Sequence, residues 1–122
     1  MPIQVEWDGD EKRLIRWNFV GRWTARELRE TIEKSNELIG AQDHVVNHII
    51  DFSKAEGMPA NLINETRHAV EQMPKNLGQV VFIAEGIAIK VLGQAFQRFS
   101  WYSGNIHLVH SDAEALAYLG SL

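Results

Sequence analysis

The sequence contains no cysteine, which excludes disulfide bonds, thiolate nucleophiles and zinc–thiolate sites. This absence is compatible with a reducing compartment, and we expect a cytoplasmic protein. The chain also lacks any apolar run near the roughly 20 residues that a membrane-spanning helix requires. Its first residues have no basic segment followed by an apolar one, so we expect neither a signal peptide nor stable membrane insertion.

Positive charge is scarce as well. The 12 Lys and Arg residues stand against 16 Asp and Glu residues, which gives a formal net charge of -4. Binding to nucleic-acid phosphates needs a surplus of Lys and Arg on one face, so nucleic acid is not an expected partner. The 122 residues, 45% of them hydrophobic and 23% charged, fit one globular domain spanning 1–122.

Alternating apolar and polar residues predict an antiparallel hairpin at the start of the chain. The two alternating runs cover 3–7 and 13–20, and the turn signal Asp8-Gly9-Asp10 lies between them. Later runs of mostly apolar, β-branched residues suit strands that are buried on both faces of a parallel sheet. These runs are 45–52, 80–83 and 106–110.

Helices are predicted between these strands. Thr24 and Glu27 form a capping box that opens a helix expected to end at Gly40. Ser111 and Glu114 form a second capping box at the start of the final helix. Two more amphipathic helices are predicted over 59–73 and 87–99. The resulting order β-β-α-β-α-β-α-β-α predicts an α/β fold, with a mostly parallel five-stranded sheet, an N-terminal antiparallel hairpin and packed helices.

This order and three short motifs resemble the STAS domain, the fold of bacterial anti-sigma-factor antagonists. Residues 15–24 resemble the family's second strand running into its first helix. Residues 49–53 resemble its apolar Asp-Leu-Ser strand end, and 111–116 resemble the start of its final helix. The resemblance spans nearly the whole chain and implies a regulatory module. Divergent relatives of this fold include lipid-binding SEC14-like domains, so the resemblance leaves an apolar ligand open.

The chain departs from the phosphorylated STAS proteins at one position. Those proteins carry a serine at the start of the helix that follows the Asp-Leu-Ser strand. The corresponding window here is 58–62, in which Asn61 falls closest to that position and no serine or threonine occurs. The resemblance therefore carries over no phosphorylation site.

Asp51, Ser53 and His110 are predicted at the carboxyl ends of strands, the edge at which open α/β sheets hold ligands. Together they offer the residue types of a nucleophile, a base and an orienting acid, which makes a hydrolase the third functional hypothesis. A structural interpretation is favoured, in which Asp51 and Ser53 satisfy loop amides and His110 precedes a helix cap. Ser53 also lacks the Gly-x-Ser-x-Gly turn that would expose a nucleophile.

The histidines predict no metal site. His44 and His48 would lie on one face of a strand but roughly 13 Å apart, beyond the reach of one ion. His107 and His110 would face opposite sides of their strand. No metal or other cofactor is therefore expected.

A surplus of aromatic side chains marks the end of the helix predicted over 87–99, and its members are Phe96, Phe99, Trp101 and Tyr102. Such clusters are more often core, but this one exceeds what one amphipathic face buries and indicates a dimer contact or a pocket wall. The leading hypothesis is a non-enzymatic STAS-like module that binds a protein partner or itself. The alternative is a binding protein for a small apolar or lipid-like molecule near this cluster.

Overall fold

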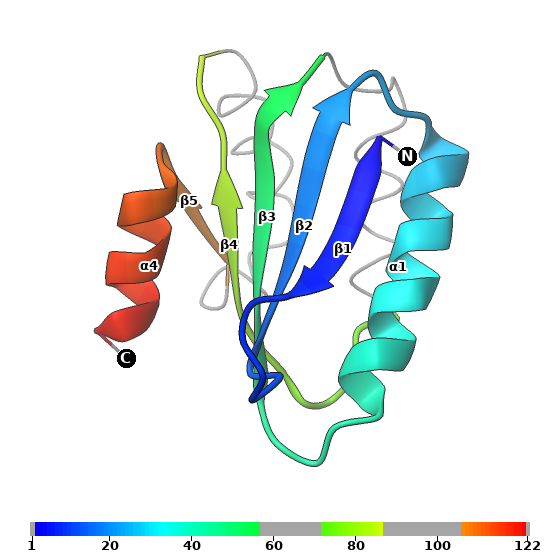
Figure 1. The fold of residues 1–122 in the computed structure, drawn as a ribbon, viewed down its shortest axis with the longest axis vertical. Helices are drawn as coiled ribbons and strands as arrows, with labels where there is room; N and C mark the ends of the chain where they lie inside the picture. Colours follow the sequence, from blue (N-terminus) through cyan, green and yellow to red (C-terminus); the bar gives the residue numbers. More distant parts are fainter. Residues whose placement is uncertain (1, 57–71, 87–105, 122) are drawn as a thin grey trace.

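The computed structural model describes residues 2–56, 72–86 and 106–121 (Figure 1). The elements in these ranges are β1 (Ile3–Trp7), β2 (Leu14–Gly21), α1 (Ala25–Gly40), β3 (Val46–Ala55), β4 (Leu77–Ile83), β5 (Ile106–Val109) and α4 (Asp112–Gly120). The strands form one sheet in the order β1-β2-β3-β4-β5, with β1 antiparallel to β2 and the other pairs parallel. The predicted α/β class with a mixed sheet is therefore confirmed. The helices predicted over 59–73 and 87–99 fall outside the described residues, except for Gln72 and Met73, which are not helical.

The predicted hairpin is confirmed, and alternation explains its packing. β1 and β2 pair from Ile3 opposite Phe19 to Trp7 opposite Ile15. Ile15, Trp17 and Phe19 are all buried, while the residues between them are more exposed. Because successive side chains of a strand point to opposite faces, these three side chains form one apolar row on the face that α1 covers.

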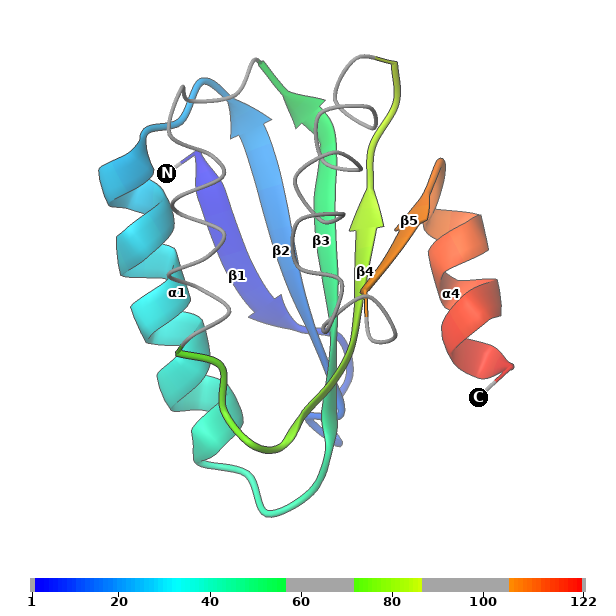
Figure 2. The same cartoon turned by 180° about the vertical axis from the view of Figure 1, so that it is seen from behind.

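α1 begins with the predicted capping box. Thr24 Oγ1 accepts a hydrogen bond from the backbone N of Glu27 at 3.2 Å, and Glu27 Oε1 accepts one from the backbone N of Thr24 at 3.1 Å. Leu28, Ile32 and Ile39 form the buried stripe of the helix. This stripe packs α1 against one face of the sheet. Both opposite views show α1 running alongside β1 (Figures 1 and 2).

α1 ends at Gly40, as predicted, but without a left-handed glycine cap. Gly40 is the last helical residue, but the following Ala41 keeps a right-handed conformation with φ of -74°. Asn76 Nδ2 donates to the carbonyl of Ile39 at 2.7 Å and to that of His44 at 3.1 Å. Because an asparagine just before β4 satisfies these carbonyls, the helix end needs no left-handed glycine.

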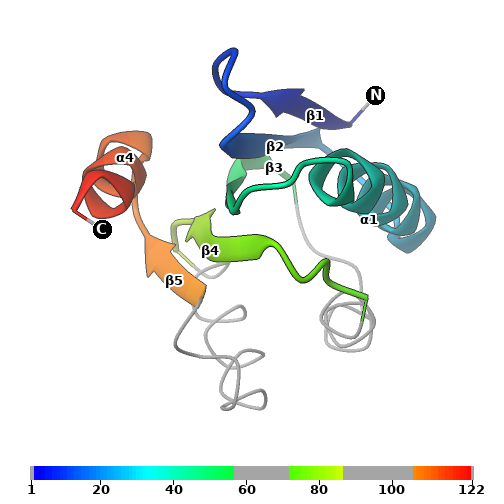
Figure 3. The ribbon, with the colours of Figure 1, turned by 90° about the horizontal axis from the view of Figure 1, so that it is seen from below.

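Both faces of the sheet carry core side chains. Figure 3 shows α1 on one side of the sheet and α4 on the other. On the α1 face, Phe52 of β3 lies 4.4 Å from Phe19 and 5.9 Å from Phe82, measured between ring centroids. The opposite face carries a smaller apolar cluster, made of Ile49, Val81, Ile83 and Ala115. Since Ala115 belongs to α4, the two helices cover opposite faces of the sheet.

α4 forms only part of its predicted capping box. Ser111 Oγ accepts from the backbone N of Glu114 at 3.2 Å, as expected. The Glu114 carboxylate, however, accepts from the backbone N of His110 at 3.0 Å, one residue before the reciprocal position. An ion pair of 2.8 Å between Arg16 and Asp112 ties the first turn of α4 to β2. No helix in the described ranges is long and apolar enough to span a lipid bilayer.

The strand boundaries also differ from prediction. β3 continues to Ala55 instead of ending at 52, and β4 begins at Leu77 instead of 80. The ladders explain both changes, because Ala55 still pairs with Gly21 of β2 and Leu77 pairs with Val46 of β3. β5 ends at Val109, so His110 lies outside the strand.

We expect one buried hydrogen bond to contribute measurably to stability. Trp17 Nε1 donates to Ser35 Oγ at 3.0 Å, and both residues are buried. The substitution Ser35→Ala should lower the free energy of unfolding in urea by about 1–3 kcal/mol, because the indole N–H loses its acceptor. Ser53→Ala, at an exposed serine, should change it by less than about 0.5 kcal/mol. Equal losses in the two variants would contradict this assignment.

Candidate functional site

Asp51 and Ser53 do not lie at the end of a strand, as the sequence predicted, but inside β3. β3 carries one extra residue here, because Asn18 pairs with Asp51 whereas Val20 pairs with Lys54. Such a bulge leaves a backbone amide outside the ladder. Asp51 Oδ1 accepts a hydrogen bond from the backbone N of Ser53 at 2.8 Å. The carboxylate therefore stabilises the bulge, in agreement with the structural role favoured for it.

His110 occupies the predicted position after β5 and before the cap of α4. Its side chain is 67% exposed, and its Nδ1 lies 3.6 Å from the Glu114 carboxylate. Within the described residues, no hydrogen bond or ion pair joins His110 to Asp51 or Ser53. The three candidates are thus engaged in separate local structures, and the described geometry brings no nucleophile–base–acid arrangement together.

The aromatic candidates lie outside the described residues. Phe96, Phe99, Trp101 and Tyr102 all fall between β4 and β5, in the range 87–105. Their proposed role as a dimer contact or a pocket wall stays a prediction.

His44 and His48 occupy different settings. His44 precedes β3, and its Nε2 lies 2.9 Å from the carbonyl oxygen of Lys12, so the two histidines do not share a strand. His48 lies in β3 and is buried against the indole of Trp17, with 4.5 Å between ring centroids. Its Nε2 has no hydrogen-bond partner in the described part of the chain. In the described ranges, no three His, Asp or Glu side chains are grouped so as to hold a metal ion.

A polar trio on the α4 face of the sheet was not predicted. The Tyr118 hydroxyl contacts His107 Nε2 and donates to Gln79 Oε1 at 3.2 Å, and His107 Nε2 also lies 3.2 Å from that oxygen. These side chains come from α4, β5 and β4 and are partly buried. The strand predicted over 80–83 did not include Gln79, so no sequence pattern indicated that its side chain would face those of His107 and Tyr118. The trio joins the edge of the sheet to the last helix.

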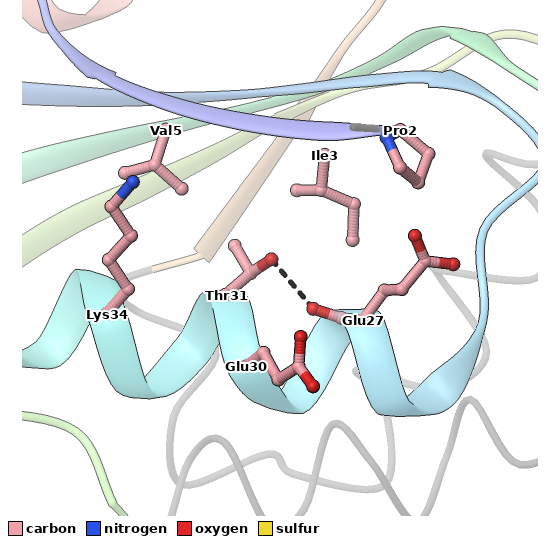
Figure 4. A pocket seen from close by; sticks show the side chains of 7 residues that line it. All are labelled: Pro2, Ile3, Val5, Glu27, Glu30, Thr31 and Lys34. Carbon is pink, nitrogen blue, oxygen red and sulfur yellow. Dashed lines mark hydrogen bonds between the residues drawn. The ribbon is translucent and has the colours of Figure 1, made fainter.

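The described surface holds a pocket between β1 and the first half of α1 (Figure 4). Its volume is about 170 Å³. Pro2, Ile3 and Val5 of the β1 side provide an apolar floor, and Thr31 closes it from the helix, where its hydroxyl donates to the Glu27 carbonyl at 2.8 Å. No sequence pattern indicated this pocket, because its two walls come from segments that meet only through tertiary packing.

Three charged side chains of α1 surround the pocket. Glu27 is held by the capping box, and Glu30 Oε1 lies 3.3 Å from Arg26 Nε. Lys34 is exposed and makes no hydrogen bond or ion pair with any described residue. Glu27 keeps its negative charge beside Ile3, whereas Lys34 places a cation without a described ion-pair partner beside Val5 (Figure 4).

The buried imidazole predicts how stability depends on pH. Burial lowers the pKa of His48 from 6.5 to about 3. Between these values the unfolded chain binds a proton that the folded chain does not, so stability falls as the pH drops below about 6.5. From about pH 7.5 to about pH 5, His48 alone should remove about 2 kcal/mol from the free energy of unfolding.

Urea denaturation at the two pH values tests this expectation. His48→Leu should remove that part of the pH dependence, because the side chain no longer titrates. His110→Gln, at an exposed histidine, is the matched control and should behave like the wild type. A His48→Leu variant with the full wild-type pH dependence would show that another group is responsible.

Comparison with known proteins identifies no family for this chain. No protein-family model matches it, and no curated protein matches it. The candidate site is a small pocket with an apolar floor, formed by the first strand of the sheet and the first helix. Lys34, which has no described ion-pair partner, lies at its rim.

Proposed function

We propose that this chain is a non-enzymatic, STAS-like regulatory module of the cytoplasm that binds a protein partner through the surface formed by β1 and α1. The mixed sheet with an N-terminal hairpin is compatible with a STAS-like scaffold. The STAS topology itself, which would need helices between β3, β4 and β5, is part of the proposal.

The size of the β1–α1 pocket is the observation that favours a protein partner over a small ligand. At about 170 Å³, it is smaller than the roughly 300–1,000 Å³ of typical small-molecule sites. Such a volume suits one or two side chains of a macromolecular partner better than a whole ligand. The apolar floor would receive a side chain, and the charged rim would select it, which is the usual division of roles in a protein interface.

A binding protein for a small apolar or lipid-like molecule is the second candidate. Its support lies in the core, where His48 Nε2 and Trp23 Nε1 are buried without hydrogen-bond partners among the residues that the structure describes. Unpartnered polar atoms are costly in a folded protein, and a ligand with a hydroxyl or carbonyl group would satisfy them. Hydrolysis through Asp51, Ser53 and His110 is the third candidate, and the local roles of Asp51 and His110 weigh against it.

We expect affinity capture to depend on the floor of the pocket. The protein, immobilised through its C-terminus, would be exposed to a lysate of its source cells. Val5→Lys should reduce retention of the specific partner by about tenfold or more, because a charge replaces part of the apolar floor. Leu116→Lys, at an apolar residue of α4 that is 46% exposed, is the matched control and should retain the partner.

Native mass spectrometry of the purified protein separates the two leading candidates. The proposal predicts the bare mass of 13.9 kDa, or a multiple of it, under native conditions. Extra mass that disappears on denaturation would favour the small-ligand alternative. Equal capture by the wild type and Val5→Lys would contradict the β1–α1 surface as the binding site.

A further inference from the structure

The outer side of β1 presents backbone groups that the sheet does not use. The backbone N of Val20 donates to the carbonyl of Pro2 at 2.7 Å, and the backbone N of Asp8 donates to that of Leu14 at 2.8 Å. In an antiparallel ladder, alternate residues direct their N–H and C=O groups to the partner strand. The backbone groups of the even residues of β1 therefore face β2. The backbone groups of Ile3, Val5 and Trp7 point away from it.

No described element continues the sheet beyond β1. The strand order places β1 at one end of the sheet. Figure 3 shows α1 beside one face of the sheet and not in line with it beyond β1. An edge strand with unpaired N–H and C=O groups is a template for a further strand.

The outward-pointing backbone and the pocket belong to the same residues. Ile3 and Val5 direct their backbone groups to the open edge and their side chains to the floor of the pocket (Figure 4). A strand added to β1 would lie about 4.8 Å away. Its side chains opposite Ile3 and Val5 would have their Cβ atoms about 4.5–5.5 Å from those residues, and so would reach the pocket.

The rim decides which charge the added strand should carry. Glu27 and Glu30 already have partners in the capping box and in Arg26, respectively. Lys34 has none among the described residues, and its side chain lies beside Val5 (Figure 4). A carboxylate opposite Val5 would meet this ammonium group. On the same face, the next side chain of the added strand would lie opposite Ile3, about 7 Å further along.

We propose that β1 binds an extended segment of a partner protein as an added strand, with an apolar side chain opposite Ile3 and an Asp or Glu opposite Val5 that pairs with Lys34. The recognised pattern is an acidic residue and an apolar residue separated by one position. This inference rests on the proposed function and names the chemistry of its partner. The main-chain bonds would provide affinity, and the pocket with Lys34 would provide selectivity.

The test uses the full chain and a peptide that carries the pattern in both directions, acetyl-Thr-Leu-Thr-Glu-Thr-Leu-Thr-amide. Amide hydrogen exchange, measured by NMR, reports directly on the backbone N–H groups of β1. Binding should slow exchange at Ile3, Val5 and Trp7 and leave Gln4 and Glu6 nearly unchanged, because the latter already face β2. A peptide that is N-methylated at every residue from the first leucine to the second should not bind, since it has no N–H group with which to pair in either strand direction.

Charge reversal tests the role of Lys34. Lys34→Glu should weaken binding of the peptide about threefold to tenfold, as expected for an exposed ion pair that becomes a repulsion. The same variant should prefer a peptide with Lys in place of Glu. Lys75→Glu makes the same change of charge just before Asn76, at the other end of α1, and should bind like the wild type.

Several results would overturn the inference. Bound peptide without slower exchange at Ile3, Val5 and Trp7 would place it elsewhere. Exchange that slows with protein concentration alone would assign the edge to a second copy of the chain. Absence of peptide binding, together with partner capture that still depends on Val5, would refute strand addition and leave the proposed function intact. Capture that does not depend on Val5 would instead count against the proposed function.

Discussion

β2 is the strand on which the rest of the structure depends, because it pairs with an antiparallel strand on one side and with a parallel strand on the other. Its even residues face β1 in an antiparallel ladder, as the bond from Val20 N to Pro2 O shows. Its odd residues face β3 in a parallel ladder, which begins with the bond from Asn47 N to Arg13 O. Parallel neighbours need a crossover, so α1 must run back along the sheet between β2 and β3. That path lays α1 next to β1, and the pocket between them follows from the topology.

Polar groups beneath α1 show how closely this crossover is packed. Trp17 fills the space between sheet and helix, and its indole N–H is satisfied by Ser35 of α1. His48 lies edge-on to the same indole, and its Nε2 has no partner among the described residues. Burial disfavours the charged imidazole and lowers the pKa of His48, so this side chain is neutral near pH 7. The core therefore couples the docking of α1 to the protonation of one histidine on the central strand of the sheet.

The sequence predicted those features that depend on local chemistry. Alternation located β1 and β2, and Thr24 with Glu27 located the start of α1, because each pattern has one local cause. Features that depend on distant residues were missed or displaced. The bond from Asn76 to the carbonyl of Ile39 near the end of α1 was not predicted, and β3 extends to Ala55 because its ladder with β2 continues past a bulge. No sequence pattern indicated the pocket or the trio around Tyr118, since their members meet only in the folded chain.

The two edge strands differ in what they offer a partner. Strand addition needs free backbone groups along the edge and, beside them, space for the side chains of the new strand. At β5 the α4 face of the edge is occupied, because His107 is bound to Tyr118 and Gln79. At β1 the side chains next to the free amides line an open pocket, and the lysine at its rim is available. This asymmetry favours β1 over β5 for the proposed strand addition, and the small volume of the pocket would limit recognition to single side chains of an extended segment.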